Sequence, residues 1–313
     1  MRIATFNAQN LRLRRPAGRP RLDGARDGDV AQDNTPRARA LDLADRRLTA
    51  ALIAAADPDI LCLQEVFDQD TLDFFHRHLL RATGIAPWPH RFCLPGNDGG
   101  GRDLAVLARV PVRVISHAAL IPADLDLPPA PGQRAERPVF CRDCLMIEAP
   151  GLTLFSCHFK APWPDPAAAW DLRRLEALAV RRLIERRFAG DADPVWLVLG
   201  DLNEPAAPGP DSAIAPLTDS FAIDLLARMP AHDRWSFALP AEAGGGVSRP
   251  DMFLASPTVA RRWPNAVPKI WRSGMGREIA ADGAPRLPDV GPHRPRASDH
   301  ALLTLDLPAP TPA

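Results

Sequence analysis

The chain lacks tyrosine altogether, and only Lys160 and Lys269 among its 38 basic residues are lysines, so arginine carries nearly all of its positive charge. Its 313 residues also lack net charge, because 38 acidic residues match the basic ones. A neutral chain offers no general basic surface that would attract nucleic acid or a membrane, although a local basic patch is compatible with this balance. The preference for arginine and the 35 prolines are typical of a biased nucleotide composition and by themselves indicate no function.

Long hydrophobic runs are also missing. No stretch reaches the about 18 consecutive apolar residues that a membrane-spanning helix needs. The opening segment MRIATFNAQN is a short strand-like run and not the apolar stretch of a signal peptide. We therefore expect a cytoplasmic protein without a membrane span, and a monomer as the default.

Cysteine is scarce and odd in number. Three of the five residues lie inside apolar runs, so we expect buried free thiols in a reducing compartment. Cys141 and Cys144 have the CxxC spacing of zinc and redox sites, but no second pair follows them. The spacing is therefore a weak indication of either site.

Short apolar runs bounded by turn residues predict buried strands. They cover residues 3–6, 60–63, 104–107, 139–147, 152–157, 195–199, 252–255 and 301–307. Apolar residues spaced three and four apart predict helices over 37–56, 71–83 and 167–188, and in the last of these we expect the arginines to face outward. Strands mixed with helices indicate an α/β sandwich. Because the composition shows no break, we expect a single domain over 1–307 and a frayed tail over 308–313.

Two segments read as long loops. Residues 12–34 are rich in Arg, Asp, Gly and Pro and have six arginines between Arg12 and Arg26, whereas 125–137 are rich in proline. The arginine-rich segment fits either a solvated loop or a flap that grips phosphate beside a site. The sequence leaves both interpretations open.

Polar side chains stand where the predicted strands end or begin. In open α/β sheets, ligands bind at the carboxyl ends of the strands. Each such residue by itself also fits a simple turn, because Asn and Asp are good turn formers. The repeated pattern instead predicts one site built from hard oxygen ligands and two histidines. Its members are Asn7, Glu65, His158, Asp201, Asn203, Asp299 and His300.

Six segments, in this order, resemble the signature segments of the endonuclease/exonuclease/phosphatase superfamily: TFNAQN, LCLQEV, SCHFKAP, VLGDLNEP, RPDMFLAS and ASDHALL. That superfamily includes DNases, abasic-site endonucleases, inositol-phosphate phosphatases and sphingomyelinases. The resemblance runs from residue 3 to about 306. It implies a four-layer α/β/β/α sandwich, in which helices flank two mixed sheets and the active site lies at one end of the sheets.

The hard oxygen donors suit Mg²⁺, with Mn²⁺ as a substitute, better than zinc. Glu65 is the leading ligand. The resemblance implies that Asn7 supports the metal and that Asp299 reaches it directly or through water. Asp201 is the candidate for orienting and deprotonating the attacking water, and Asn203 is the candidate for holding that water or a phosphate oxygen.

His158 and His300 are candidates for donating to a phosphate oxygen in the transition state. In the superfamily an aspartate pairs with the final histidine, and Asp251 occupies that position here. A carboxylate beside an imidazole favours the protonated imidazolium. Because Pro250 cannot donate to a sheet, we expect the strand to begin at or after Asp251.

Two cationic residues are candidates for binding substrate. Lys160 follows the His158 strand and fits either a phosphate contact or a surface lysine. Arg102, in the segment Gly101-Arg102-Asp103, fits a substrate-positioning role. Arg142 and Asp143 are left open between pairing with their neighbours and lining the site.

These features predict a Mg²⁺-dependent phosphoesterase that hydrolyses a phosphodiester with an activated water, in the manner of a nuclease acting on DNA or RNA. The lack of tyrosine disfavours abasic-site repair, because the resemblance places a phenolic hydroxyl near the phosphate in those enzymes. A phosphomonoesterase or lipid phosphodiesterase of the same fold is the alternative, and a catalytically inactive binding scaffold is the alternative outside enzymes.

Overall fold

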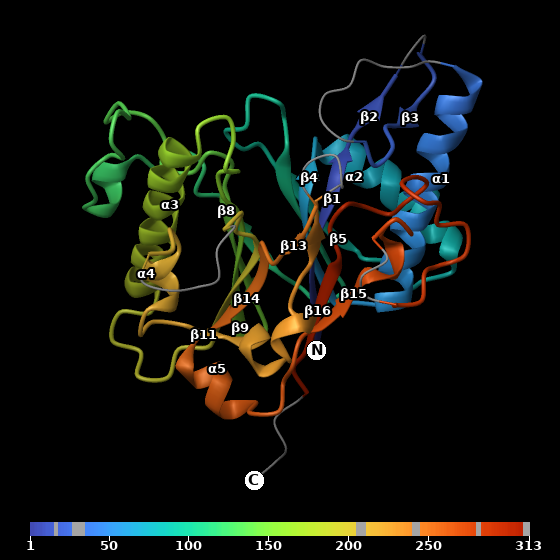
Figure 1. The fold of residues 1–313 in the computed structure, drawn as a ribbon. Helices are drawn as coiled ribbons and strands as arrows, with labels where there is room; N and C mark the ends of the chain where they lie inside the picture. The colour runs from blue at the N-terminus through green and yellow to red at the C-terminus, as the bar shows by residue number, and fades with distance from the viewer. Residues whose placement is uncertain (16–17, 27–34, 205–210, 240–244, 280–282, 309–313) are drawn as a thin grey trace.

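The computed structural model describes residues 1–15, 18–26, 35–204, 211–239, 245–279 and 283–308. Two six-stranded sheets stack face to face, and helices cover the outer face of each (Figure 1). This arrangement is the four-layer sandwich that the resemblance implies. Of the predicted tail, residues 309–313 lie outside the described residues.

The first sheet has the order β15-β16-β1-β4-β6-β5. Its strands β1 and β4 run parallel, and every other neighbouring pair in it is antiparallel. The strands are β15 (Lys269–Trp271), β16 (Leu302–Asp306), β1 (Arg2–Leu11), β4 (Ile60–Val66), β6 (Asp103–Ala108) and β5 (His90–Leu94).

The second sheet has the order β11-β14-β10-β9-β8-β7. Here β9 and β10 form the parallel pair, and the other neighbours are antiparallel. The strands are β11 (Ile223–Asp224), β14 (Asp251–Ala255), β10 (Trp196–Asp201), β9 (Leu152–His158), β8 (Cys144–Ala149) and β7 (Arg113–Ile115).

Each sheet has its own helices (Figure 1). The helices α1 (Pro36–Ala56) and α2 (Gln69–Phe75) cover the first sheet, and α3 (Pro166–Arg187) and α4 (Ala215–Thr218) cover the second. The short helix α5 (Pro257–Arg262) follows β14. Side-chain caps begin the long helices, since Thr35 accepts from the Ala38 amide and Asp165 from the Ala167 amide.

The alternation of side chains along each strand explains how the sheets and helices form layers. Successive side chains of a strand point to opposite faces. In β10, Leu197 and Leu199 pack between the two sheets, whereas Val198 packs toward α3. In β4, Cys62 likewise packs between the sheets and Leu63 toward α1. Strands that are apolar on both faces can lie only inside such a sandwich.

The structure departs from the predicted elements in places. The run 139–147 is a strand only from Cys144, because residues before it bond to loops instead, as the Val139 amide does to the Leu120 carbonyl. The predicted helix 71–83 is α2 followed by a π turn over His76–Leu80 and a 3-10 turn over Arg81–Thr83. Short edge strands such as β5 and β15 carry too few apolar residues to be predicted.

The loop expected over 12–34 contains a hairpin, β2 (Leu13–Arg14) and β3 (Arg21–Leu22), while residues 27–34 lie outside the described part. The prediction that the arginines of the helix 167–188 face outward is wrong at Arg173, which is buried and donates from Nη1 to the Lys160 carbonyl at 3.1 Å.

Candidate active site

The Asp201 carboxylate joins the two sheets. It ends β10 of the second sheet, and its Oδ2 accepts a hydrogen bond of 3.0 Å from Nδ2 of Asn7, in β1 of the first sheet. The Nε2 atoms of His158 and His300 lie 3.4 and 3.8 Å from the same Oδ2. The carboxyl ends of β9 and β10 therefore meet β1 at one edge of the sandwich, as the sequence pattern predicts, although Asn7 lies within β1 and does not end it.

The Gly-Asp-Leu-Asn segment presents Asp201 through a turn. Gly200 has a φ of 132°, and a Cβ on it would lie 2.0 Å from the Cys157 carbonyl oxygen, so only glycine fits. Oδ1 of Asp201 accepts from the Asn203 amide at 2.9 Å, and Asn203 itself has a φ of 50°. Asn203 Nδ2 donates to the Phe159 carbonyl at 3.0 Å. Asp201 and Asn203 therefore form the turn and also belong to the candidate site.

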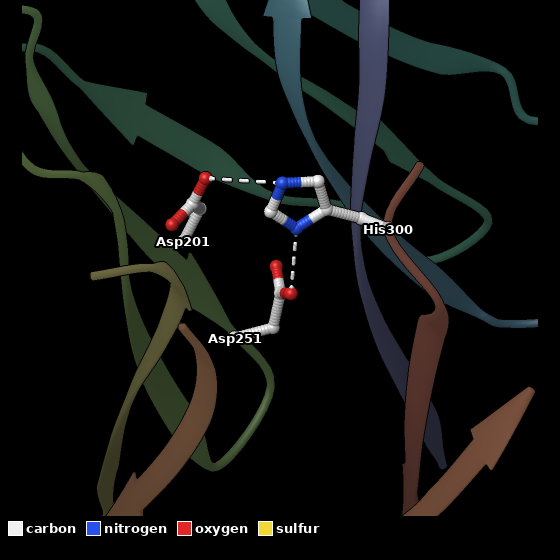
Figure 2. A group of neighbouring side chains, drawn as sticks. All are labelled: Asp201, Asp251 and His300. Atoms are coloured by element: carbon white, nitrogen blue, oxygen red, sulfur yellow. Dashed lines mark hydrogen bonds and ion pairs between the residues drawn. The ribbon is translucent and has the colours of Figure 1, made fainter. Parts of the chain in front are cut away.

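Asp251 and His300 form a pair beside Asp201. The first residue of β14 lies opposite Asp201 in the sheet register, and its Oδ2 lies 2.8 Å from Nδ1 of His300. Figure 2 shows that the two aspartates face different nitrogens of the His300 ring. The strand begins at Asp251, as Pro250 led us to expect. Ser236 Oγ donates to the same Asp251 oxygen at 2.7 Å and so fixes the carboxylate.

The environment sets the charges of this group. Burial opposes a charge on His300, but Asp251, with help from Asp201 and Asp299, outweighs it and raises the pKa of His300 to about 10. Burial, with a contribution from Asp251, raises the pKa of Asp201 to about 6, although His300 and Asn7 counteract the rise. Near neutral pH the site therefore holds a cationic imidazolium beside an ionised but readily protonated carboxylate.

His158 differs from His300 in charge. Burial, reinforced by Arg142, His300 and Arg102, lowers its pKa well below the ordinary value. Its ring is therefore neutral at physiological pH. Within the described residues, the buried Nδ1 of His158 has no hydrogen-bond partner.

Glu65 lies at a distortion of the first sheet. Its φ of 63° falls at the register shift between Gln64 and Val66, a bulge that turns the side chain toward the site. Oε1 accepts from Asn7 Nδ2 at 3.2 Å, and Oε2 accepts from the Asn10 amide at 2.8 Å. The side chain keeps 16% of its surface exposed, so a ligand can reach it.

Two buried residues that the sequence did not single out hold this edge in place. Arg46 of α1 donates to the carbonyls of Ala8, Gln9 and Asn10, where β1 bulges. Ser298 Oγ donates to the Asn7 carbonyl at 2.7 Å and accepts from the His300 amide at 3.1 Å. Ser298 lies within the quoted segment ASDHALL, which was a usable signal, whereas nothing in the sequence marks Arg46 among the many arginines.

The remaining predicted site residues lie nearby with different contacts. The Asp299 amide donates to Gln9 Oε1 at 3.1 Å, which brings Asp299 to the end of β1. Arg102 Nε donates to Asn10 Oδ1 at 2.8 Å and lies 4.0 Å from Glu65. Lys160 Nζ donates to the Trp163 carbonyl, so the lysine is engaged with the backbone next to the site.

Arg142 and Asp143, whose roles the sequence leaves open, hold neighbouring segments of the backbone. Arg142 donates to the Phe159 carbonyl at 2.8 Å, and Asp143 accepts from Ser116 and from the His117 amide. The five cysteines are free, and none belongs to a potential metal group in the described part of the chain.

One group of potential metal ligands is Asp201, Asp251 and His300, whose ligand atoms lie within 4.8 Å of one another. These three residues already contact one another, since Nδ1 of His300 lies 2.8 Å from Oδ2 of Asp251 and its Nε2 lies 3.8 Å from Oδ2 of Asp201. Glu65, with Asp299 and Asn7 beside it, offers the hard oxygens that a divalent cation such as Mg²⁺ prefers.

A cavity of about 460 Å³ opens beside this group. Asn203, Glu204, Ser248 and His300 form its polar side, and Phe237, Leu239 and Val247 supply apolar walls. The ring of Phe237 lies 4.8 Å from that of His300. A substrate with an apolar or aromatic group next to its phosphate would fit this surface. Among the described residues, no helix is long and apolar enough to cross a bilayer.

Known structures share the fold. An endonuclease/exonuclease/phosphatase from Beutenbergia cavernae is 18% identical, with a TM-score of 0.57 over 97% of this chain and 70% of its own. An AP endonuclease from Archaeoglobus fulgidus is 15% identical, with a TM-score of 0.58 over 99% of this chain and 100% of its own. A truncated TDP2 from Caenorhabditis elegans is 14% identical, with a TM-score of 0.56 over 97% and 96%.

No curated protein matches the sequence significantly. The model of the Endonuclease/Exonuclease/phosphatase family matches residues 4–300, which is nearly the whole chain and includes every predicted site residue. The chain therefore belongs to the endonuclease/exonuclease/phosphatase family of phosphoester hydrolases.

Proposed function

We propose that the protein is a divalent-metal-dependent phosphodiesterase that hydrolyses its substrate, in the manner of a nuclease, with an activated water. The observation that carries the proposal is the convergence of Asn7, His158 and His300 on one oxygen of Asp201. A buried carboxylate with a pKa of about 6 is deprotonated at neutral pH yet basic enough to take a proton.

The proton movements follow from these charges. Asp201 accepts a proton from the attacking water, whose oxygen forms a bond to phosphorus. His300, held cationic by Asp251, donates from Nε2 to the leaving oxygen as the bond between that oxygen and phosphorus breaks. His158 is neutral and donates a hydrogen bond to a non-bridging phosphate oxygen. Asn203, whose Nδ2 is bonded to Phe159, accepts from the water through Oδ1.

A divalent cation, with Mg²⁺ as the expected ion, would be held by Glu65 and Asp299. Asn7 would support it by orienting Glu65, because the Asn7 oxygen accepts from the Gln9 amide and its nitrogen donates to Glu65 and Asp201. When bound, such an ion supplies positive charge to the phosphate oxygens and orients the substrate.

The substrate class is proposed from the cavity. The apolar walls formed by Phe237, Leu239 and Val247 would receive a nucleobase or another apolar ring next to the phosphate, which supports DNA or RNA as substrate. A lipid phosphodiesterase could use the same walls. Arg102 and Lys160, at the edge of the site, are proposed to contact substrate phosphates.

Turnover of bis-p-nitrophenyl phosphate and of single-stranded DNA, with Mg²⁺ or Mn²⁺ and after EDTA, tests the proposal. We expect Asp201→Asn to lower kcat by about 10²- to 10⁴-fold, the usual contribution of a general base, with little change in KM. Asp219→Asn, an exposed aspartate, is the matched control. Undiminished activity in Asp201→Asn contradicts the mechanism, and no turnover of any ester by the wild type would indicate an inactive scaffold.

Raising the salt concentration separates the substrate classes. Affinity for a nucleic acid falls steeply with salt, because phosphate contacts release counterions. A flat salt response, with turnover of a lysophospholipid-type diester, would instead indicate the lipid phosphodiesterase.

A further inference from the structure

A second cavity, of about 590 Å³, lies against the outer helix layer of the first sheet. We name it the α1 cavity. It is lined by β3, by α1 and by the segment that continues from the end of α2 through the following turns. None of the predicted catalytic or metal-binding residues lines it.

Arg21 of β3 is a buried cation without a counterion. Its Nε, Nη1 and Nη2 atoms are buried, and none has a hydrogen-bond partner in the described part of the chain. Most buried polar groups in proteins are hydrogen-bonded, and an uncompensated buried charge is strongly destabilising. Arg21 also lines the α1 cavity, so a rotation of its side chain would turn the guanidinium toward a ligand bound there.

Two further arginines border the same cavity. Arg39 and Arg47 lie on one face of α1, with Leu43 between them at helical spacing. Neither guanidinium makes a hydrogen bond or an ion pair to any residue that the structure describes. On the buried side of the same helix, by contrast, Asp42 pairs with Arg26 and Asp45 with Arg294.

Among the residues that the structure describes, no carboxylate lines the cavity to offset the arginines. Arg46 also reaches the cavity, but its guanidinium is already bound to backbone carbonyls. The cavity therefore concentrates positive charge in a chain whose net charge is zero. Guanidinium groups bind phosphate through paired hydrogen bonds, which makes a phosphate the fitting anion.

The rest of the lining is apolar and partly aromatic. Leu22 is buried, Leu43 leaves 44% of its surface exposed, and the ring of Phe74 lies 4.4 Å from that of His78. Flat aromatic surfaces of this kind accept a stacked ring. The volume falls within the about 300–1,000 Å³ that small-molecule sites occupy.

We propose that the α1 cavity is a second, non-catalytic site that binds a small organic phosphate with a flat ring, of the size of a nucleoside monophosphate. Arg21, Arg39 and Arg47 bind the phosphate, and Phe74 with His78 faces the ring. The site goes beyond the proposed hydrolysis, because no residue of the proposed mechanism takes part in it.

Isothermal titration with adenosine 5′-monophosphate tests this proposal. The titrations use the protein carrying Asp201→Asn, which slows turnover, and are repeated in a His300→Gln background that alters the active site. In both backgrounds we expect one binding event that Arg21→Met and Leu43→Glu each weaken by at least about tenfold. Arg113→Met and Val267→Glu, two exposed positions away from the cavity, leave it unchanged.

The same titration is repeated with two fragments of the ligand to show which part the cavity binds. Adenosine lacks the phosphate and inorganic phosphate lacks the ring, so each is expected to bind at least about tenfold more weakly than the monophosphate. Leu43→Glu keeps the test valid if Arg21→Met does not fold, because Leu43 lies at the surface.

Three results overturn the proposal. The first is unchanged binding in Leu43→Glu, and the second is binding that disappears with His300→Gln, which would place the ligand in the active site. The third is equal affinity for adenosine and its monophosphate. A failure of the proposed hydrolysis leaves all of these titrations interpretable, since they measure binding alone.

Discussion

Nδ2 of Asn7 lies 3.0 Å from Oδ2 of Asp201, and this hydrogen bond crosses from one sheet of the sandwich to the other. The two residues are separated by 194 positions in the chain. The same asparagine nitrogen lies 3.2 Å from Glu65, so Asn7 connects the proposed base with the proposed metal ligand.

Removing the Asn7 amide should move the acid limb of the pH–rate profile. The hydrogen bond from Asn7 lowers the pKa of Asp201, which burial raises to about 6. The base works when deprotonated, so activity falls as the pH drops through this pKa. Asn7→Ala should shift the acid limb of kcat/KM to higher pH and reduce its plateau. Asn97→Ala, which removes an amide bonded to two carbonyls elsewhere, should not shift that limb.

Asp251→Asn should move the alkaline limb in the opposite direction. Asp251 keeps the pKa of His300 near 10 against the effect of burial. His300 acts in its protonated form, so activity falls as the pH rises through that pKa. Without the carboxylate, we expect the alkaline limb of kcat/KM to fall by more than about one pH unit. An unchanged limb would mean that His300 is not the acid.

Replacing Glu65, the proposed metal ligand, should change the response of the Tm to Mg²⁺ as well as the activity. A ligand that binds only the folded state stabilises it, by about 2.7 kcal/mol at a concentration 100 times its Kd. Mg²⁺ should therefore raise the Tm of the wild type, and Glu65→Gln should abolish the rise. Glu185→Gln, an exposed position, should behave as the wild type. A rise lost in Asp251→Asn but kept in Glu65→Gln would place the ion at the Asp201–Asp251–His300 group instead.

Gly200 and Gly132 provide a matched pair for stability. Both have positive φ, of 132° and 75°, but a Cβ on Gly200 would lie 2.0 Å from the Cys157 carbonyl oxygen, whereas one on Gly132 meets nothing within 4 Å. Gly132→Ala should cost about 1–2 kcal/mol, the backbone strain alone. Gly200→Ala should cost more than about 4 kcal/mol by chemical denaturation, or prevent folding. Similar costs at the two positions would refute the steric argument.

Strong local patterns were enough to predict the layers of the fold and several of the polar residues that meet at one edge of it. The apolar runs of β4, β9 and β10 predict buried strands because they are apolar on both faces. Polar residues at the ends of those runs predict Glu65, His158 and Asp201, since parallel strands bring their carboxyl ends together. Such signals depend on a few neighbouring residues and need no knowledge of the fold.

The sequence by itself therefore determined the family, the sandwich and the residue types that meet at one edge. Only the tertiary structure decided their protonation, because the opposite pKa shifts of His158 and His300 depend on burial and on which charges lie nearby. The tertiary structure also decided which groups each arginine contacts. Arg46, Arg26 and Arg21 look alike in the sequence, yet one binds carbonyls, one pairs with Asp42 and one is left facing a cavity. Contacts between residues distant in the chain set these differences, and no local pattern encodes them.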